Sequence, residues 1–124
     1  MNNRVEEALG LGIDFQVAAR ENLIGKGRRP FTGYLIVLED EEQSHVCRST
    51  HSVHFPADKI FDTASYAQRL NIMCERIMSE QLFDSACVIT SPNNHRGEFN
   101  NLSDSTSIKS FLAAFAARMA EASV

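Results

Sequence analysis

The feature that most constrains the fold is an apolar run at residues 31–38, which reads Phe-Thr-Gly-Tyr-Leu-Ile-Val-Leu. From Tyr34 to Leu38 the run lacks the polar alternation of a half-exposed strand. A short continuous apolar run of this kind is typical of a β-strand with both faces buried. Pro30 precedes the run and acidic residues 39–42 follow it, so its ends are well marked. We therefore expect a strand that needs neighbours on both faces.

The remaining elements alternate with this strand. Residues 86–90 predict a second short buried strand, and helical spacing of apolar residues appears at 4–22, from 65 onward, and at 107–121. Asn3 is the expected N-cap of the first helix, and Ser65 with Gln68 predicts a capping box for the second. The order is α–β–α–β–α, an α/β arrangement in which a parallel strand pair is flanked by helices and joined right-handedly. Two strands cannot form a stable open sheet alone, so we expect sheet partners from elsewhere.

Composition indicates one folded domain over residues 1–124. The chain is 44% hydrophobic and carries 12 basic and 16 acidic residues, a net charge of −4. This balance does not favour nucleic-acid binding, although local distribution matters more than the total. No apolar run reaches the length of a membrane span. The odd set Cys47, Cys74 and Cys87 has no CxxC pair and is typical of a reducing cytoplasm, with Cys74 and Cys87 as small core residues.

Two motifs carry a family resemblance. They are Asn2-Asn3-Arg4-Val5-Glu6-Glu7-Ala8 at the start of the first helix and the strand at 31–40, with weaker matches in the same order at 54–56, 65–69 and 82–87. The chain resembles the XhoI family of type II restriction endonucleases. The resemblance implies the PD-(D/E)xK nuclease fold, in which carboxylates and a lysine hold Mg²⁺ and activate water. It also implies duplex DNA with a palindromic hexanucleotide as substrate, and hence a two-fold homodimer.

In that family the helix with this motif follows the strand that carries the catalytic Glu-x-Lys. Because this chain starts at the helix, we interpret residues 1–124 as the C-terminal part of a restriction-endonuclease-like domain without its catalytic strands. The nearest approach to the catalytic pattern, Pro56-Ala57-Asp58-Lys59, has the wrong spacing. No catalytic residue and no Mg²⁺ ligand is therefore assigned.

Two groups of residues are candidates for DNA binding. A helix N-terminus with amides and an arginine can hold a phosphate, and a basic Gly-rich loop can follow the DNA backbone. The candidates are Asn2, Asn3, Arg4, Lys26, Arg28 and Arg29. The alternative is a capped helix with solvated charges. Residues 93–96, Asn-Asn-His-Arg, have groups that suit base edges, but an ordinary surface turn is the simpler interpretation.

A metal site is a further possibility. His45, Cys47, His51 and His54 are all competent zinc ligands within ten residues, although their spacing matches no closed four-ligand pattern. The acidic residues 39–42 follow a strand, where α/β proteins place ligands, but a solvated turn is favoured.

Three hypotheses follow: a XhoI-like nuclease that is inactive without an upstream segment, a non-catalytic DNA-binding or interaction module derived from one, and a small zinc-binding α/β protein. With sheet partners missing, we expect the chain alone to be unstable or to self-associate.

Overall fold

The chain folds around a three-stranded mixed sheet. The computed structural model describes residues 2–24, 29–47, 59–61 and 63–122. The strands are β1 (Gly33–Glu39), β2 (Ser85–Ser91) and the two-residue β3 (Asn100–Asn101), in the order β1-β2-β3. β1 and β2 are parallel, with Gly33 opposite Ser85 and Glu39 opposite Ser91, and β3 is antiparallel to β2.

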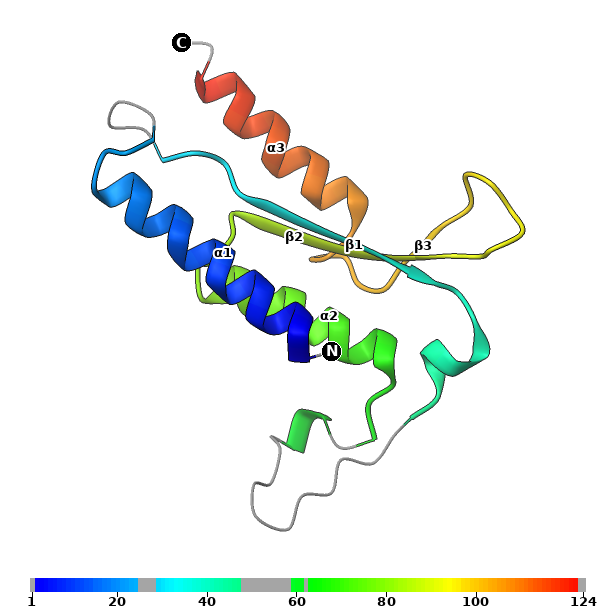
Figure 1. Cartoon of the computed structure of the whole chain (residues 1–124). Coiled ribbons are helices and arrows are strands. Elements are labelled where there is room, and N and C mark those ends of the chain that lie inside the picture. Colours follow the sequence, from blue (N-terminus) through cyan, green and yellow to red (C-terminus); the bar gives the residue numbers. More distant parts are fainter. Residues whose placement is uncertain (1, 25–28, 48–58, 62, 123–124) are drawn as a thin grey trace.

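Three helices cover the two faces of the sheet. α1 (Asn2–Arg20) and α2 (Tyr66–Ser79) lie against one face, and α3 (Ile108–Ala122) lies against the other (Figure 1). Two short 3-10 helices, Glu42–His45 and Lys59–Phe61, stand between β1 and α2. The expected α–β–α–β–α order and the parallel pair are confirmed, and β3 is an addition inside a segment predicted to be a loop. In the described part of the chain no helix is long and apolar enough to cross a membrane.

The core lies between the sheet and the layer of α1 and α2. Leu70, Cys74 and Val88 are almost fully buried there. α1 enters this core through Ala8, and Gly12 lets its backbone approach the segment after α2, since a Cβ at Gly12 would lie 3.1 Å from the Leu82 carbonyl oxygen. Cys74 and Cys87 are buried as predicted, and burial raises the pKa of the Cys74 thiol to about 12.

Local helix signals had mixed outcomes. The capping box is confirmed: Gln68 N–H donates to Ser65 Oγ at 3.1 Å, and Ser65 N–H donates to Gln68 Oε1 at 2.8 Å. The N-cap role of Asn3 is wrong, because α1 begins at Asn2 and Asn3 lies inside it. α1 also ends at Arg20, two residues before the predicted end, and Asn22 takes a left-handed φ of 57°.

The expectation that β1 is buried on both faces is wrong. Its residues alternate between exposed and half-buried, with Leu35 49% and Val37 59% exposed. Tyr34, Ile36 and Leu38 pack toward the core, whereas the opposite face is covered only near Gly33, which lies against Phe111 of α3. The reason is that β1 stands at the edge of the sheet, where α3, which packs mainly over β2, does not cover it.

Candidate nucleic-acid interface

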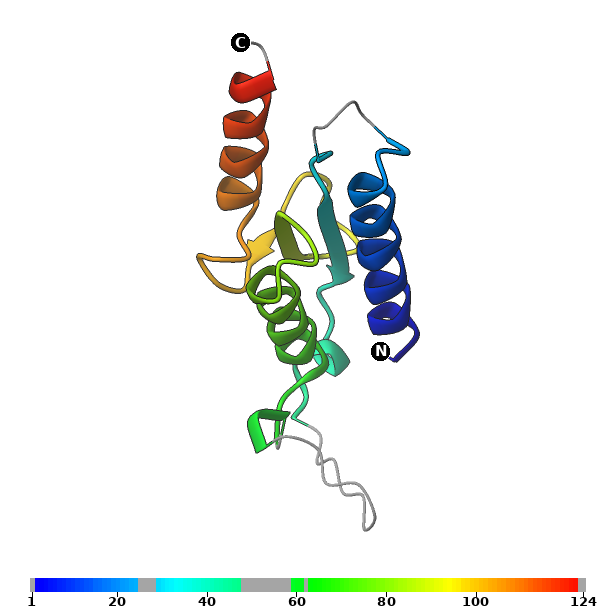
Figure 2. The ribbon, with the colours of Figure 1, turned by 90° about the vertical axis from the view of Figure 1, so that its left-hand side faces the viewer.

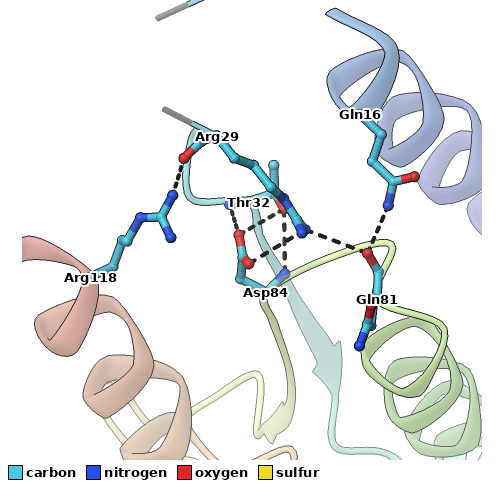
Figure 3. Close-up of polar contacts among 6 residues, drawn as sticks. All are labelled: Gln16, Arg29, Thr32, Gln81, Asp84 and Arg118. Carbon is cyan, nitrogen blue, oxygen red and sulfur yellow. Dashed lines mark hydrogen bonds and ion pairs between the residues drawn. The ribbon is translucent and has the colours of Figure 1, made fainter. Parts of the chain in front are cut away.

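The entrance to β1 is held by a buried backbone contact. Asp84, directly before β2, accepts a hydrogen bond from Thr32 N–H at 2.8 Å through Oδ2, and the Thr32 hydroxyl lies 3.2 Å from the same oxygen (Figure 3). Asp84 N–H in turn donates to the Thr32 carbonyl at 2.9 Å. Thr32 is buried, so this exchange satisfies polar groups that water cannot reach and joins the two strands at their first residues.

Two arginines meet at this entrance. The Arg29 guanidinium lies 3.4 Å from Asp84 Oδ1, with its side chain 42% exposed, and also lies 3.5 Å from the Gln81 carbonyl. Arg118 of α3 donates to the Arg29 carbonyl (Figure 3). Because one carboxylate faces two guanidinium groups, this corner carries net positive charge, and we name Arg29 and Arg118 the basic corner.

Arg4 lies apart from the basic corner. Its guanidinium pairs with Glu7 at 2.9 Å on the exposed N-terminal turn of α1, and this hydrogen bond raises the pKa of Arg4. Gln16, like Arg29, donates to the Gln81 carbonyl, so Arg29 lies beside the later turns of α1. Twelve helical residues separate Arg4 from Gln16, which is about 18 Å along the axis.

The other predicted DNA-binding residues cannot be placed in the same way. Lys26 and Arg28 lie outside the described residues, as does the side-chain placement of Asn2 and Asn3. The structure therefore describes two of the six candidates, Arg4 and Arg29, and sets them at different ends of α1.

A second polar group lies at the carboxyl end of β1. Asp40 Oδ1 lies 2.7 Å from His45 Nε2, and Asn100 Nδ2 donates to Asp40 Oδ2 at 3.4 Å. Beside it is an open cavity of about 520 Å³, lined by Leu38, Glu39, Glu41, Gln43, Ser44, Tyr66 and Arg69. The acidic residues that follow β1 thus form a partly paired rim at this cavity.

The described residues do not form a metal centre. No three His, Cys, Asp or Glu side chains among them are grouped so that they could hold an ion. His45 is directed at Asp40, and Cys47 forms an isolated bridge with Ser65, while His51 and His54 fall outside the described ranges. The zinc hypothesis gains no support, and the donor set present does not fit Mg²⁺ either, because the Asp40 carboxylate already has His45 and Asn100 as partners.

Sequence reasoning missed Asp84 and Arg118. Asp84 follows an apolar segment and precedes a strand, with no local pattern that links it to Thr32, which lies 52 residues earlier. For Arg118 a signal existed: it falls seven residues after Phe111, on the side of α3 that faces the sheet. A cation on that side of an otherwise apolar helix indicates a specific partner.

Comparisons with known proteins agree with the resemblance. The profile described as "Restriction endonuclease XhoI" matches residues 1–102. The chain is 40% identical over 91 residues to the type II restriction enzyme BstVI of Geobacillus stearothermophilus, covering 73% of this chain and 41% of BstVI. It is 42% identical over 77 residues to the type II restriction enzyme XhoI of Xanthomonas vasicola, covering 62% and 31%.

A third relative, the type II restriction enzyme AbrI of Azospirillum brasilense, is 44% identical over 54 residues, 44% of this chain and 24% of AbrI. No solved structure matches the chain significantly. The chain spans about two fifths of the length of BstVI and less of the other two. Its α/β layers and the match over 102 of its 124 residues place it in one group: the chain belongs to the restriction endonuclease XhoI family.

Proposed function

We propose that this chain is the part of a type II restriction endonuclease that supports the catalytic strands and contacts the DNA backbone. The observation that carries the proposal is the family match over residues 1–102. The reaction is hydrolysis of phosphodiesters in duplex DNA, with Mg²⁺, a palindromic site, a two-fold homodimer and a cytoplasmic location as the family resemblance implies. The Mg²⁺ ligands and the catalytic residues must come from outside the residues described here.

The chain's own contribution is to bind and orient DNA. The basic corner supplies two guanidinium groups, and Arg29 is held by Asp84 and Gln81, so its position is fixed before DNA arrives. A charge held in place in this way loses less conformational freedom when it binds a phosphate. Lys26 and Arg28 belong to the same basic segment of the sequence, which favours a backbone-contacting role for residues 26–29.

A chimera tests the nuclease proposal directly. In BstVI, the 91 aligned residues are replaced by those of this chain, and the chimera is incubated with supercoiled plasmid and Mg²⁺, with unmodified BstVI as the control. We expect cleavage by the chimera and none by this chain alone. A folded chimera without cleavage would refute the proposal and favour the non-catalytic interaction module.

Binding of the chain itself to DNA tests the basic corner. Fluorescence anisotropy with a labelled duplex is recorded between about 50 and 200 mM salt, the range over which phosphate contacts weaken strongly. Arg29→Ala and Arg118→Ala should each reduce the slope of log affinity against log salt by about one unit, whereas Lys109→Ala, an exposed cation at the opposite end of α3, should not change it. Equal losses in all three variants would show that only total charge matters.

A further inference from the structure

One edge of β1 is open. Among the described residues β1 pairs with β2 alone, and β2 lies between β1 and β3. The hydrogen bonds at both ends of β1 show which residues face β2: the Thr32 carbonyl accepts from Asp84 N–H, and Asp40 N–H donates to the Ser91 carbonyl. In a strand the N–H and C=O of one residue point to the same side and alternate along the chain. Even-numbered residues therefore bond to β2, and Leu35 and Val37 direct their amides to the open edge.

The helix α1 marks where a further strand belongs. α1 lies on the same face of the sheet as α2, and Figure 2 shows it beside β1 on the side away from β2. The unit β1–α2–β2 advances across the sheet in one direction, and such crossovers share one hand. A strand that precedes α1 and connects through it to β1 must advance in the same direction. It therefore lies parallel to β1, at its open edge.

Apolar side chains wait on both sides of that position. On the α3 face, Leu35 and Val37 are 49% and 59% exposed. On the α1 face, Leu11 and Phe15 lie one helical turn apart and are 51% and 42% exposed, and Phe15 lines a small crevice with Pro30 and Thr32 at the start of β1. A strand at this edge is therefore covered on both faces, which calls for a continuous apolar segment.

The edge also lacks the usual protection against strand addition. Between Gly33 and Leu38 the strand has no proline, no charge and no bulge. A second copy of β1 is a poor occupant, since two-fold pairing of edges would bring two α1 helices into the space above adjacent strands, and helices need about 8–10 Å between axes where strands need about 4.8 Å.

We infer that the open edge of β1, together with Leu11 and Phe15 of α1, is a docking site for one apolar β-strand from the part of a XhoI-family polypeptide that this chain does not match, bound parallel to β1. More than half of BstVI lies outside the aligned residues, so such a strand has an available source. The inference rests on the family membership and adds the site, the direction and the face chemistry of the partner.

The test uses overlapping 15-residue peptides that cover BstVI outside the 91 aligned residues. Each is added at up to about 2 mM, a range suited to weak strand addition, to the ¹⁵N-labelled chain. Backbone amide shifts and hydrogen exchange are then recorded. We expect an apolar peptide to bind and to slow exchange at Leu35 and Val37, whereas Ile36 and Leu38 are already protected by β2.

Matched variants separate edge pairing from general stickiness. Val37→Pro removes an amide that only the docked strand uses, and Val37→Thr keeps that amide. Leu11→Glu places a charge above the docked strand, and Ile13→Glu places one on the other side of α1 at equal exposure, 50% against 51%. Val37→Pro and Leu11→Glu should abolish detectable binding, and each control should change it less than about twofold.

Several results would overturn the inference. They are no peptide binding to the folded chain, binding without protection of Leu35 and Val37, or protection in the chain alone that rises with its own concentration, which would make a second copy the occupant. Strand docking without cleavage by the chimera described above would leave the inference intact and remove the nuclease proposal. Cleavage without docking would do the reverse.

Discussion

Replacing Asp84 tests how the basic corner is held. In Asp84→Ala the Thr32 N–H loses its acceptor at 2.8 Å, and the Arg29 guanidinium loses the carboxylate at 3.4 Å. Thr32 is only 7% exposed, so its amide cannot turn to water for a replacement. A hydrogen bond to a charged acceptor contributes about 1.5–3 kcal/mol net, and the exposed ion pair adds about 0–1 kcal/mol. We expect a loss of about 2–3 kcal/mol in the free energy of unfolding.

Urea unfolding followed by circular dichroism at micromolar protein measures this loss. With a slope near 2 kcal/mol per M for a small domain, the midpoint should fall by about 1 M. Two variants divide the contributions. Asp84→Asn keeps an acceptor oxygen and should lose about half as much, whereas Arg29→Ala removes only the exposed pair and should shift the midpoint by less than about 0.3 M. An Arg29→Ala shift as large as that of Asp84→Ala would refute the assignment of the main contribution to the Thr32 contact.

Three further outcomes follow from the core and the helix ends. The pKa of Cys74 is raised from 9.0 to about 12, so above pH 9 the unfolded chain loses a proton that the folded chain keeps; the free energy of unfolding should fall as pH rises from 9 to 12, and Cys74→Ala should flatten this slope in denaturation series. Ser65→Ala should cost about 1 kcal/mol in the same unfolding assay by removing the acceptor of Gln68 N–H, and an unchanged midpoint would argue against the capping box. Gly33→Ala places a Cβ 2.8 Å from the Phe111 ring, so it should loosen α3 and speed its proteolysis, and Phe111→Leu should restore resistance; equal rates in all three proteins would contradict that contact.

Local chemistry decided which elements could be predicted from the sequence. The capping box at Ser65 needs only residues 65–68, and the strand at 85–91 is apolar because it is central to the sheet, so both were predicted close to their observed bounds. The parallel pairing followed from the crossover helix between two strands. The Asp84–Thr32 contact joins residues 52 positions apart, and no local pattern records it.

The candidate site was predicted only in part for the same reason. Arg29 was selected from the basic segment, but its position depends on Asp84, Gln81 and Arg118, which come from three distant segments. α3 shows the opposite error. Its apolar spacing correctly predicted a helix, but none of its residues is fully buried, and Leu112, Phe115 and Met119 are among its exposed residues.

The wrong expectation for β1 leads to the energetics of strand docking. Four apolar side chains at the open edge, Leu11, Phe15, Leu35 and Val37, are each about half exposed. Full burial of such a side chain is worth about 1.5–3 kcal/mol, so a docked strand recovers about 1 kcal/mol from each and about 4 kcal/mol in all. Ordering five residues of a free peptide costs about 5–10 kcal/mol, and the main-chain hydrogen bonds at the edge must supply the difference. A short peptide should therefore bind only weakly, in the millimolar range, whereas the same strand joined covalently to α1 bears much less of that cost. Affinity that rises steeply when the peptide is linked to the start of α1 is the expected sign that the apolar run of β1 is matched to a neighbouring strand.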